Sequence, residues 1–180
     1  LLNLINIPIL TTWKSLDIFS DDHPLYIGRP GAVGQRGANI SQQSSDLLIM
    51  LGARMDMGQT AYMHKHLAPL AKRVMIDIDN NEIEKMKTEI HIKFNYDVKI
   101  FLKELINQLK NEPELTKYEF KSWIETCKGL KHKYPMVLQE YYQFKDGISL
   151  YLMIDKLSEH LTGDDVVVPG SSGACSEVTM

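Results

Sequence analysis

Short apolar runs alternate with polar or amphipathic stretches over the first hundred residues. The runs IPILTTW, LYIG, DLLIMLG, RVMIDID and IHIKFNY occupy residues 7–13, 25–28, 46–52, 73–79 and 90–96. Turn-forming or charged residues bound each of them. The runs LYIG, DLLIMLG and RVMIDID are near-continuous, which is typical of strands that are buried on both faces of a parallel sheet. We therefore expect a strand at each of the five runs.

Helical patterns fill the gaps between these runs. Candidate helices cover residues 35–44, 80–86 and 97–110. The last reads DVKIFLKELINQLK, in which apolar residues recur at the i, i+3, i+4, i+7 spacing of an amphipathic helix and Asp97 is a good N-cap. Asn80 is a plausible N-cap for the short helix, with Glu82 in its first turn. This strand–helix alternation predicts an α/β layered fold with right-handed crossovers.

The pattern changes after Asn111. Residues 111–147 are charged, aromatic and poor in strand signals, and they predict one helix over 118–132 that Pro135 stops. A new α/β unit then begins, with a helix over 148–161, a turn TGDD and a strand VVVPG over 166–170. We therefore divide the chain into a first domain, 1–147, that ends in a helical linker, and the start of a second domain, 148–180. We expect the chain to be a piece of a longer polypeptide.

Composition narrows the classes of function. The chain has 180 residues, 44% of them hydrophobic, and a net charge of −3, so no basic field favours nucleic acid or an anionic membrane. No apolar run approaches the roughly 18 residues that span a bilayer. Cys127 and Cys175 lie outside any CxxC pattern, which suggests free thiols in a reducing compartment and a cytoplasmic location. His64 and His66 lack a signalled third ligand, so we interpret them as polar surface residues and expect no metal site.

The stretch GRPGAVGQRGAN, residues 28–39, places Gly28, Gly31, Gly34 and Gly37 at intervals of three between a predicted strand and a predicted helix. A glycine loop in this position can present N–H groups to an anion. The spacing, however, is neither the GxGxxG of the dinucleotide fingerprint nor a P-loop ending in GK[ST]. Two interpretations stay open: a phosphate-binding loop, or a bend that crosses the edge of the sheet.

Other candidates follow the next two strands. Gly52, Ala53 and Arg54 follow one run, and Asp77 and Asp79 close another. Ligands of open parallel sheets bind outside the carboxyl ends of the strands. Arg54 could pair with phosphate there or form a surface salt bridge. The two aspartates could bind ribose hydroxyls, or they could cap the next helix, which is the better account of Asp79.

Taken in order, these motifs resemble one family. The series GxxG, AN, DLLIMLGARxD, HxxxAPxAKRVMIDIDxxEIxK and IxxxxDVxxFL is similar to the central domain of thiamine-diphosphate-dependent enzymes, on the acetolactate-synthase-like branch. The resemblance implies a three-layer α/β/α Rossmann-like domain with a mostly parallel sheet of about six strands. It also implies thiamine diphosphate and Mg²⁺ in a longer enzyme, a homodimer or homotetramer, that decarboxylates and ligates 2-keto acids.

The resemblance also assigns site residues. In flavin-binding relatives, the matching positions that would line an FAD or nucleotide groove are Gly31, Gly34, Asn39, Gly52, Ala53, Arg54, Asp77, Asp79, Asp97 and Val98. The matching positions that would lie beside thiamine diphosphate are Ser172, Gly173, Ala174 and Cys175. Where relatives read GxRFDDR this chain reads GARMDMG, so Met55, Met57 and Gly58 replace an aromatic residue, an acid and an Arg. This departure counts against the binding of FAD and favours a nucleotide groove that is vestigial or empty.

The family's activating Glu and its GDG metal motif have no counterpart among these residues, so we assign no catalytic residue and expect the 180-residue chain to be inactive. Two alternatives remain open. One is a stand-alone Rossmann-like module that binds a nucleotide such as FAD or ADP without thiamine chemistry. The other is a non-catalytic interaction protein built on the same fold.

Overall fold

The computed structural model describes residues 1–168 and 170, and it confirms the α/β class. The strands are β1 (Ile9–Leu10), β2 (Tyr26–Gly28), β3 (Leu47–Leu51), β4 (Lys72–Asp77) and β5 (Ile92–Asn95). The α-helices are α1 (Arg36–Gln43), α2 (Met57–Thr60), α3 (Asn80–Glu84), α4 (Val98–Asn111), α5 (Lys121–Lys133) and α6 (Leu150–Ser158). Short 3₁₀ helices are η1 (Trp13–Ser15), η2 (His64–His66), η3 (Pro113–Lys117) and η4 (Gln139–Gln143). Within the described part, no helix combines the length and the apolar composition that a membrane crossing requires.

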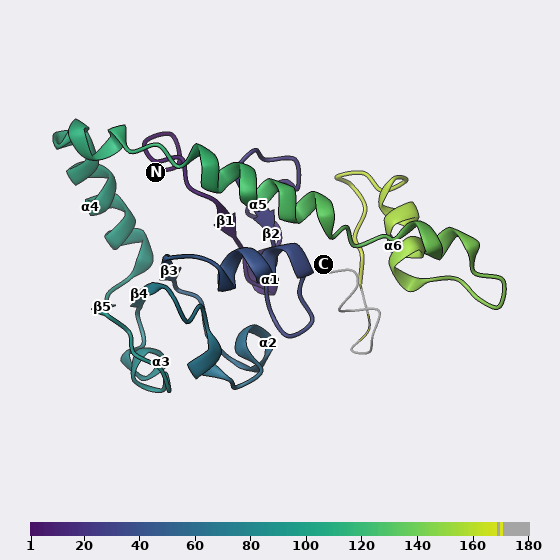
Figure 1. The fold of residues 1–180 in the computed structure, drawn as a ribbon, viewed down its shortest axis with the longest axis horizontal. Helices are drawn as coiled ribbons and strands as arrows, with labels where there is room; N and C mark the ends of the chain where they lie inside the picture. The colour runs from purple at the N-terminus through teal and green to yellow at the C-terminus, as the bar shows by residue number, and fades with distance from the viewer. Residues whose placement is uncertain (169, 171–180) are drawn as a thin grey trace.

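The strands form two parallel sheets rather than one. β1 pairs with β2, and β3, β4 and β5 form a second sheet in that order. The described residues thus contain five strands, where the resemblance implied about six in a single sheet. Figure 1 shows the two sheets as separate ribbons that are connected through α1. All five predicted strands are present, although β1 is only two residues long.

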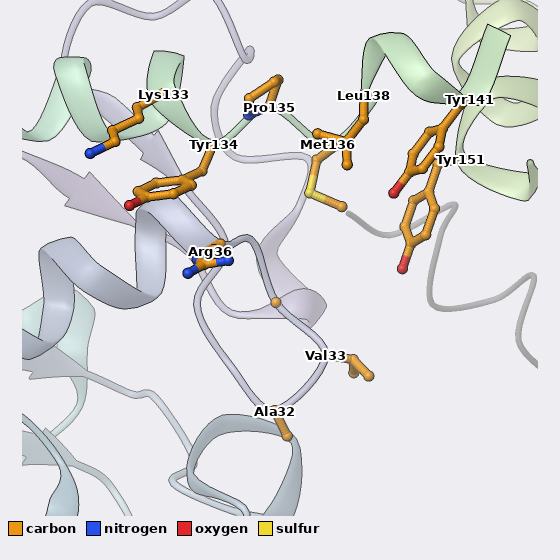
Figure 2. A pocket seen from close by; sticks show the side chains of 11 residues that line it. Ala32, Val33, Arg36, Lys133, Tyr134, Pro135, Met136, Leu138, Tyr141 and Tyr151 are labelled. Carbon is orange, nitrogen blue, oxygen red and sulfur yellow. The ribbon is translucent and has the colours of Figure 1, made fainter. Parts of the chain in front are cut away.

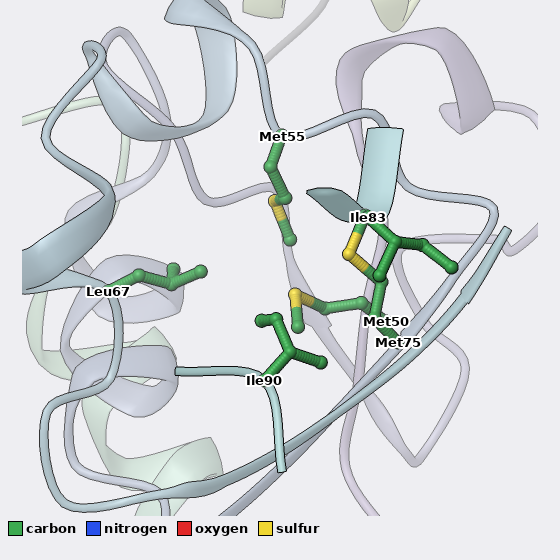
Figure 3. Packing of buried hydrophobic residues seen from close by; sticks show 6 residues of the cluster. All are labelled: Met50, Met55, Leu67, Met75, Ile83 and Ile90. Carbon is green, nitrogen blue, oxygen red and sulfur yellow. The ribbon is translucent and has the colours of Figure 1, made fainter. Parts of the chain in front are cut away.

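One face of the β3–β4–β5 sheet carries the main hydrophobic core. Met50 of β3 and Met75 of β4 are register partners, so their side chains point to the same face. They pack with residues of α3, of the segment around η2 and of the loop before β5, and Figure 3 shows how these side chains converge: Met50, Met55, Leu67, Met75, Ile83 and Ile90. Leu48, Ala53 and Met86 pack around this cluster.

The opposite face of the same sheet is only partly covered. Phe101 of α4 lies 5.1 Å from Phe94 of β5 between ring centroids, yet Phe94 stays 37% exposed. Leu47, Ile49 and Leu51 of β3 remain 51%, 41% and 37% exposed. The prediction that the strands are buried on both faces is therefore wrong for β3, because the described residues place too little of α4 over it.

The second packing unit joins α1, α5 and β2. A Cβ atom on Gly37 would lie 2.7 Å from the Leu130 carbonyl oxygen, so glycine is what allows α1 to approach α5 this closely. Lys131 Nζ donates to the carbonyl oxygens of Asp21, at 2.7 Å, and of Tyr26, at 3.3 Å. Gly37 therefore lies inside α1 and serves the packing of two helices.

Helix ends mostly follow the sequence signals. Asp97 Oδ1 accepts the backbone N–H groups of Lys99 and Ile100 at the start of α4, as predicted. At α3 the N-cap is Asp79, whose carboxylate accepts the N–H of Asn81. The prediction of Asn80 as the N-cap is therefore wrong by one residue, because the side chain that accepts a free N–H of the first turn is that of Asp79.

Cys127 is a free thiol, as the cysteine spacing indicated. It is fully buried in α5 beside Ser41 of α1. Burial raises the pKa of the Cys127 thiol, and the hydrogen bond with Ser41 opposes that shift to a smaller extent. A neutral buried thiol of this kind packs as a small apolar side chain. Cys175 lies outside the described residues.

The C-terminal part packs least. No residue of α6 is fully buried, and Ile148 just before it is 78% exposed. Residues 166–168 do not form a strand, and Val166 and Val168 are each 85% exposed. The predicted strand is therefore wrong over these residues. An apolar run forms a strand only where another strand completes its hydrogen-bond ladder, and none of the described strands pairs with this run.

The contact between α1 and α5 predicts that replacing glycine by alanine has opposite effects on stability at positions 37 and 129. Gly37→Ala should lower the free energy of unfolding by about 1–3 kcal/mol, because the new methyl group overlaps the Leu130 backbone. Gly129→Ala in α5 is the matched control. A Cβ there meets no atom within 4 Å, so the change should raise stability by about 0.5–1 kcal/mol through helix propensity. Urea unfolding of both variants checks this, and equal effects would contradict the packing role.

Candidate functional site

The candidate residues lie at the carboxyl ends of the strands, where parallel sheets place their ligands. Gly28 ends β2, Gly52 follows β3, and Asp77 ends β4. Gly52 has a φ of 58°, in the left-handed region that favours glycine. A Cβ on it would lie 3.2 Å from Val98 Cγ2, so the structure brings Gly52 and Val98 together.

The glycine loop after β2 is folded tightly against α2. Gly31 has a φ of 146°, and a Cβ on it would lie 2.4 Å from the carbonyl oxygen of Gly58. A Cβ on Gly34 would lie 2.5 Å from the carbonyl oxygen of Arg29. Both glycines are therefore required by the path of the backbone itself. This loop and the segment that follows β3 meet through Gly58, whose oxygen accepts the N–H of Ala32 at 2.8 Å.

Most amides of this loop already have partners within the protein. Asn39 Oδ1 accepts the N–H of Gly31, and Asn39 Nδ2 donates to the Gly31 carbonyl, each at 3.0 Å. Gln35 Oε1 accepts the N–H of Arg29 at 2.9 Å. Further loop amides donate to backbone oxygens: Ala32 to Gly58, Gly34 to Gly31 and Gln35 to Arg29. A phosphate cradle needs several free N–H groups that point to one place, and these five N–H groups are used internally.

Arg54 is engaged in a surface ion pair. Its Nε lies 3.4 Å from Glu82 Oε1, and the Arg54 side chain is 70% exposed. Glu82 also pairs with Lys85 of the same segment. The preceding Ala53 packs against the methionine-rich core. The salt-bridge interpretation of Arg54 thus describes this structure, and such exposed pairs contribute little to stability.

The side chains of Asp77, Asp79 and Asp97 accept hydrogen bonds from backbone N–H groups. Asp77 is buried, and its Oδ1 accepts the N–H of Asp79 at 2.9 Å. Asp79 and Asp97 cap α3 and α4. Each carboxylate therefore orients the turn between a strand and the next helix. The capping interpretation that we preferred for Asp79 is confirmed.

Two buried polar atoms beside the glycine loop were not identified from the sequence. Among the described residues, Asp56 Oδ1 and Arg29 Nε are buried side-chain atoms without a hydrogen-bond partner. Asp56 Oδ1 would lie 3.3 Å from a Cβ on Gly58, so it borders the contact between the loop and α2. Asp56 is the acid of the GARxD motif at residues 52–56, and this motif is the signal that could have identified it.

A hollow of about 450 Å³ lies on the other side of the glycine loop, next to the N-terminus of α1. Figure 2 shows Arg36 below the ring of Tyr134, with Tyr141 and Tyr151 along the wall. The Arg36 guanidinium lies 4.7 Å from the Tyr134 ring centroid, and the two other tyrosine rings stack at 6.1 Å. Of the candidate groove residues only Gly34 borders this hollow, so it does not coincide with the strand-end groove.

The histidines form no metal site in the described part of the chain, where no group of three His, Cys, Asp or Glu residues is suitably placed. His64 is buried, so its interpretation as a surface residue is wrong. Its Nδ1 accepts the N–H of Lys87, which leaves Nε2 to donate to the carbonyl oxygen of Met55 at 3.0 Å. His64 thus ties η2 to the segments around it, while His66 is exposed.

The residues expected beside thiamine diphosphate fall outside the described part of the chain. They are Ser172, Gly173, Ala174 and Cys175. Their role therefore stays a prediction from the resemblance.

Comparison with known proteins gives a consistent result. Residues 1–105 match the family model described as thiamine pyrophosphate enzyme, central domain. The acetolactate synthase large subunit of Corynebacterium glutamicum is 32% identical over 164 residues, which cover 91% of this chain and 25% of that protein. A probable acetolactate synthase large subunit of Methanococcus aeolicus is 36% identical over 137 residues, 73% of this chain and 22% of that protein.

Acetolactate synthase 2, chloroplastic, of Nicotiana tabacum is 32% identical over 167 residues, 93% of this chain and 24% of that protein. The chain thus spans about a quarter of the length of the relatives it matches. The family model covers more than half of the chain, and it covers all five strands of the two parallel sheets. The chain belongs to the thiamine-diphosphate-dependent enzyme family, on its acetolactate-synthase-like branch, and residues 1–105 correspond to the central domain.

Proposed function

We propose that this chain is the central part of a longer thiamine-diphosphate-dependent enzyme that decarboxylates a 2-keto acid and joins the product to an acceptor. The observation that carries the proposal is the similarity to acetolactate synthases along 91% of the chain. The parallel α/β architecture agrees with a domain of that enzyme class. We place the longer protein in the cytoplasm as a homodimer or homotetramer, with Mg²⁺ beside the diphosphate.

Within that enzyme, this chain supplies scaffold rather than the catalytic centre. We place a domain boundary near residues 146–147, with residues 148–180 as the start of the cofactor-binding domain. The exposed apolar side chains around α6 support this, since Ile148, Met153 and Leu157 are 78%, 45% and 43% exposed and would suit a surface covered by more of that domain. Bound thiamine diphosphate supplies a carbon nucleophile and an electron sink. The residues described here hold neighbouring domains in position.

The test is to compare the longer polypeptide with the 180-residue chain, each with pyruvate, thiamine diphosphate and Mg²⁺. The longer protein should release CO₂ and form acetolactate, and the 180-residue chain should show no turnover. Pyruvate turnover by the short chain would contradict the scaffold role. Failure of the longer protein to consume pyruvate or any other 2-keto acid would overturn the proposed substrate class.

We propose further that the strand-end groove is a vestigial nucleotide site. The paired amides of the glycine loop, the capping roles of the aspartates and the Arg54–Glu82 ion pair all support this. Met55 is buried in the core rather than offered to a flavin ring. The groups present therefore do not fit the diphosphate of FAD.

The longer protein should accordingly purify without the visible absorbance of flavin. Adding FAD or ADP should leave the thermal midpoint of either chain unchanged, whereas a ligand at 100 times its Kd would add about 2.7 kcal/mol of stability. A clear upward shift with either nucleotide would overturn the vestigial groove. A shift with ADP by a longer protein that lacks turnover would instead favour a nucleotide-binding module.

The structural role of Asn39 gives a second test of the groove. Asn39→Ala should destabilise the chain by about 1–2 kcal/mol, because the Gly31 N–H loses its partner and the Gly31 carbonyl oxygen keeps only the N–H of Gly34. Asn107→Ala on the exposed side of α4 is the control, with an expected change within about 0.5 kcal/mol. Chemical denaturation measures both. An Asn39→Ala chain of unchanged stability would show that the loop does not depend on this contact.

A further inference from the structure

Three segments that follow strands meet at Gly58 of α2. A Cβ on Gly31, in the loop after β2, would lie 2.4 Å from the Gly58 carbonyl oxygen, and Ala32 donates its N–H to that oxygen at 2.8 Å. Trp13, in η1 after β1, approaches from another direction. A Cβ on Gly58 would lie 3.3 Å from Trp13 Nε1 and 3.7 Å from Trp13 Cδ1. Gly58 is therefore in direct contact with both other segments.

These contacts fill the place where an open parallel sheet would leave room for a ligand. Such ligands bind outside the carboxyl ends of the strands. Trp13 and Gly31 follow the carboxyl ends of β1 and β2, which pair in parallel, and Gly58 follows the carboxyl end of β3 in the other sheet. A ligand that entered between these segments would have to displace one of the contacts at Gly58.

The contacts differ in how readily they can be removed. Gly31 meets Gly58 through backbone atoms, so only a movement of the whole loop would separate them. Trp13 contributes a side chain, which is 45% exposed, so more than half of its surface is covered. Lys14 Nζ lies 5.2 Å from the centroid of the Trp13 ring, a distance at which a cation attracts the face of an aromatic ring. Trp13 is therefore the part of this closure that a single substitution removes.

Glycine at position 58 is what leaves room for the indole. The 3.3 Å between a Cβ on Gly58 and Trp13 Nε1 is shorter than the roughly 3.5–4.0 Å of an ordinary carbon contact. Asp56 Oδ1 would lie at the same distance of 3.3 Å from this Cβ, and it is buried. A longer side chain at position 58 would therefore have to push the indole out of this space.

We propose that Trp13 is a specificity-determining residue, which closes the strand-end groove by packing over Gly58, and that the space filled by its indole takes a planar, uncharged heteroaromatic ring once the indole is removed. This inference rests on the proposal that the groove is vestigial, and it deepens that proposal. The internal hydrogen bonds of the glycine loop account for the exclusion of a diphosphate, and Trp13 accounts for the exclusion of a ring.

The surroundings of this space determine which ring it can take. The indole of Trp13 is planar and uncharged, so a ring of that kind fits the same walls. Among the described residues, Asp56 Oδ1 is a buried oxygen without a hydrogen-bond partner, and its carboxylate would repel a negatively charged ring. A ring that carries no phosphate also makes no demand on the amides of the glycine loop, which are used internally.

Riboflavin is a suitable probe, because it carries a planar, uncharged heteroaromatic ring and no phosphate. Trp13→Ala should bind riboflavin about tenfold more tightly than the unaltered chain, since removal of the indole leaves a space of the size of a ring. Trp123→Ala in α5 is the matched control and should leave the Kd unchanged. Quenching of riboflavin fluorescence measures the Kd in the 180-residue chain and in the longer polypeptide. An equal Kd for Trp13→Ala and the unaltered chain, or an equal gain in Trp123→Ala, would overturn the proposal.

Tryptophan emission gives an independent measurement. The chain has two tryptophans, so in a Trp123→Phe background the emission reports Trp13 alone. In that background Gly58→Leu should shift the emission to longer wavelength and increase its quenching by acrylamide, because the new side chain moves the indole into water. Gly129→Leu is the control, since a Cβ there meets no atom within 4 Å, and it should leave the emission unchanged. Unchanged emission in Gly58→Leu would contradict the closure, and the riboflavin measurement does not depend on how well this variant folds.

The closure by Trp13 and the proposed function fail separately. Tighter riboflavin binding by Trp13→Ala in a longer protein without 2-keto acid turnover would support the closure and overturn the proposed function. Turnover in a protein whose Trp13→Ala variant gains no affinity for riboflavin would do the reverse. Binding of FAD by the unaltered chain would overturn the vestigial groove and the closure together.

Discussion

Peptide groups that are withdrawn from water need hydrogen-bond partners, and this requirement governs both the glycine loop and the sheets. In the loop, the side chains of Asn39 and Gln35 bind the backbone of Gly31 and Arg29. In the sheets, the ladders from β3 to β5 satisfy the peptide groups that face a neighbouring strand. The same requirement thus accounts for the side chains that bind the loop backbone and for the parallel pairing of the strands.

The hydrogen bonds within this loop differ from the free N–H groups that a phosphate-binding loop presents. A glycine-rich turn between a strand and a helix binds phosphate only when its N–H groups are free and converge. In this chain Gly31 allows contact with Gly58, and Gly34 allows the loop to approach Arg29. Family membership therefore indicates where a ligand groove is expected, while the local hydrogen bonds determine which backbone groups stay free to bind.

The sequence predicted those features that depend on local patterns. Five apolar runs became the five strands, and the period of residues 97–110 with Asp97 as its cap became α4. Features that depend on distant partners were not predictable in this way. The run at 166–168 has the composition of a strand, but none of the described strands pairs with it. Gly37 reveals its role only beside Leu130, of a helix about ninety residues away.

In the candidate site, too, features set by local sequence were predictable and features set by distant segments were not. The cap formed by Asp79 follows from its place before a helix, and so it was predictable, whereas the burial of His64 and of Asp56 Oδ1 depends on segments that meet only after folding. The β3–β4–β5 sheet shows the same dependence on segments that meet only after folding. Exposed Ile49 and buried Met50 are neighbours of similar apolar character, and what distinguishes them is which face of the sheet is covered.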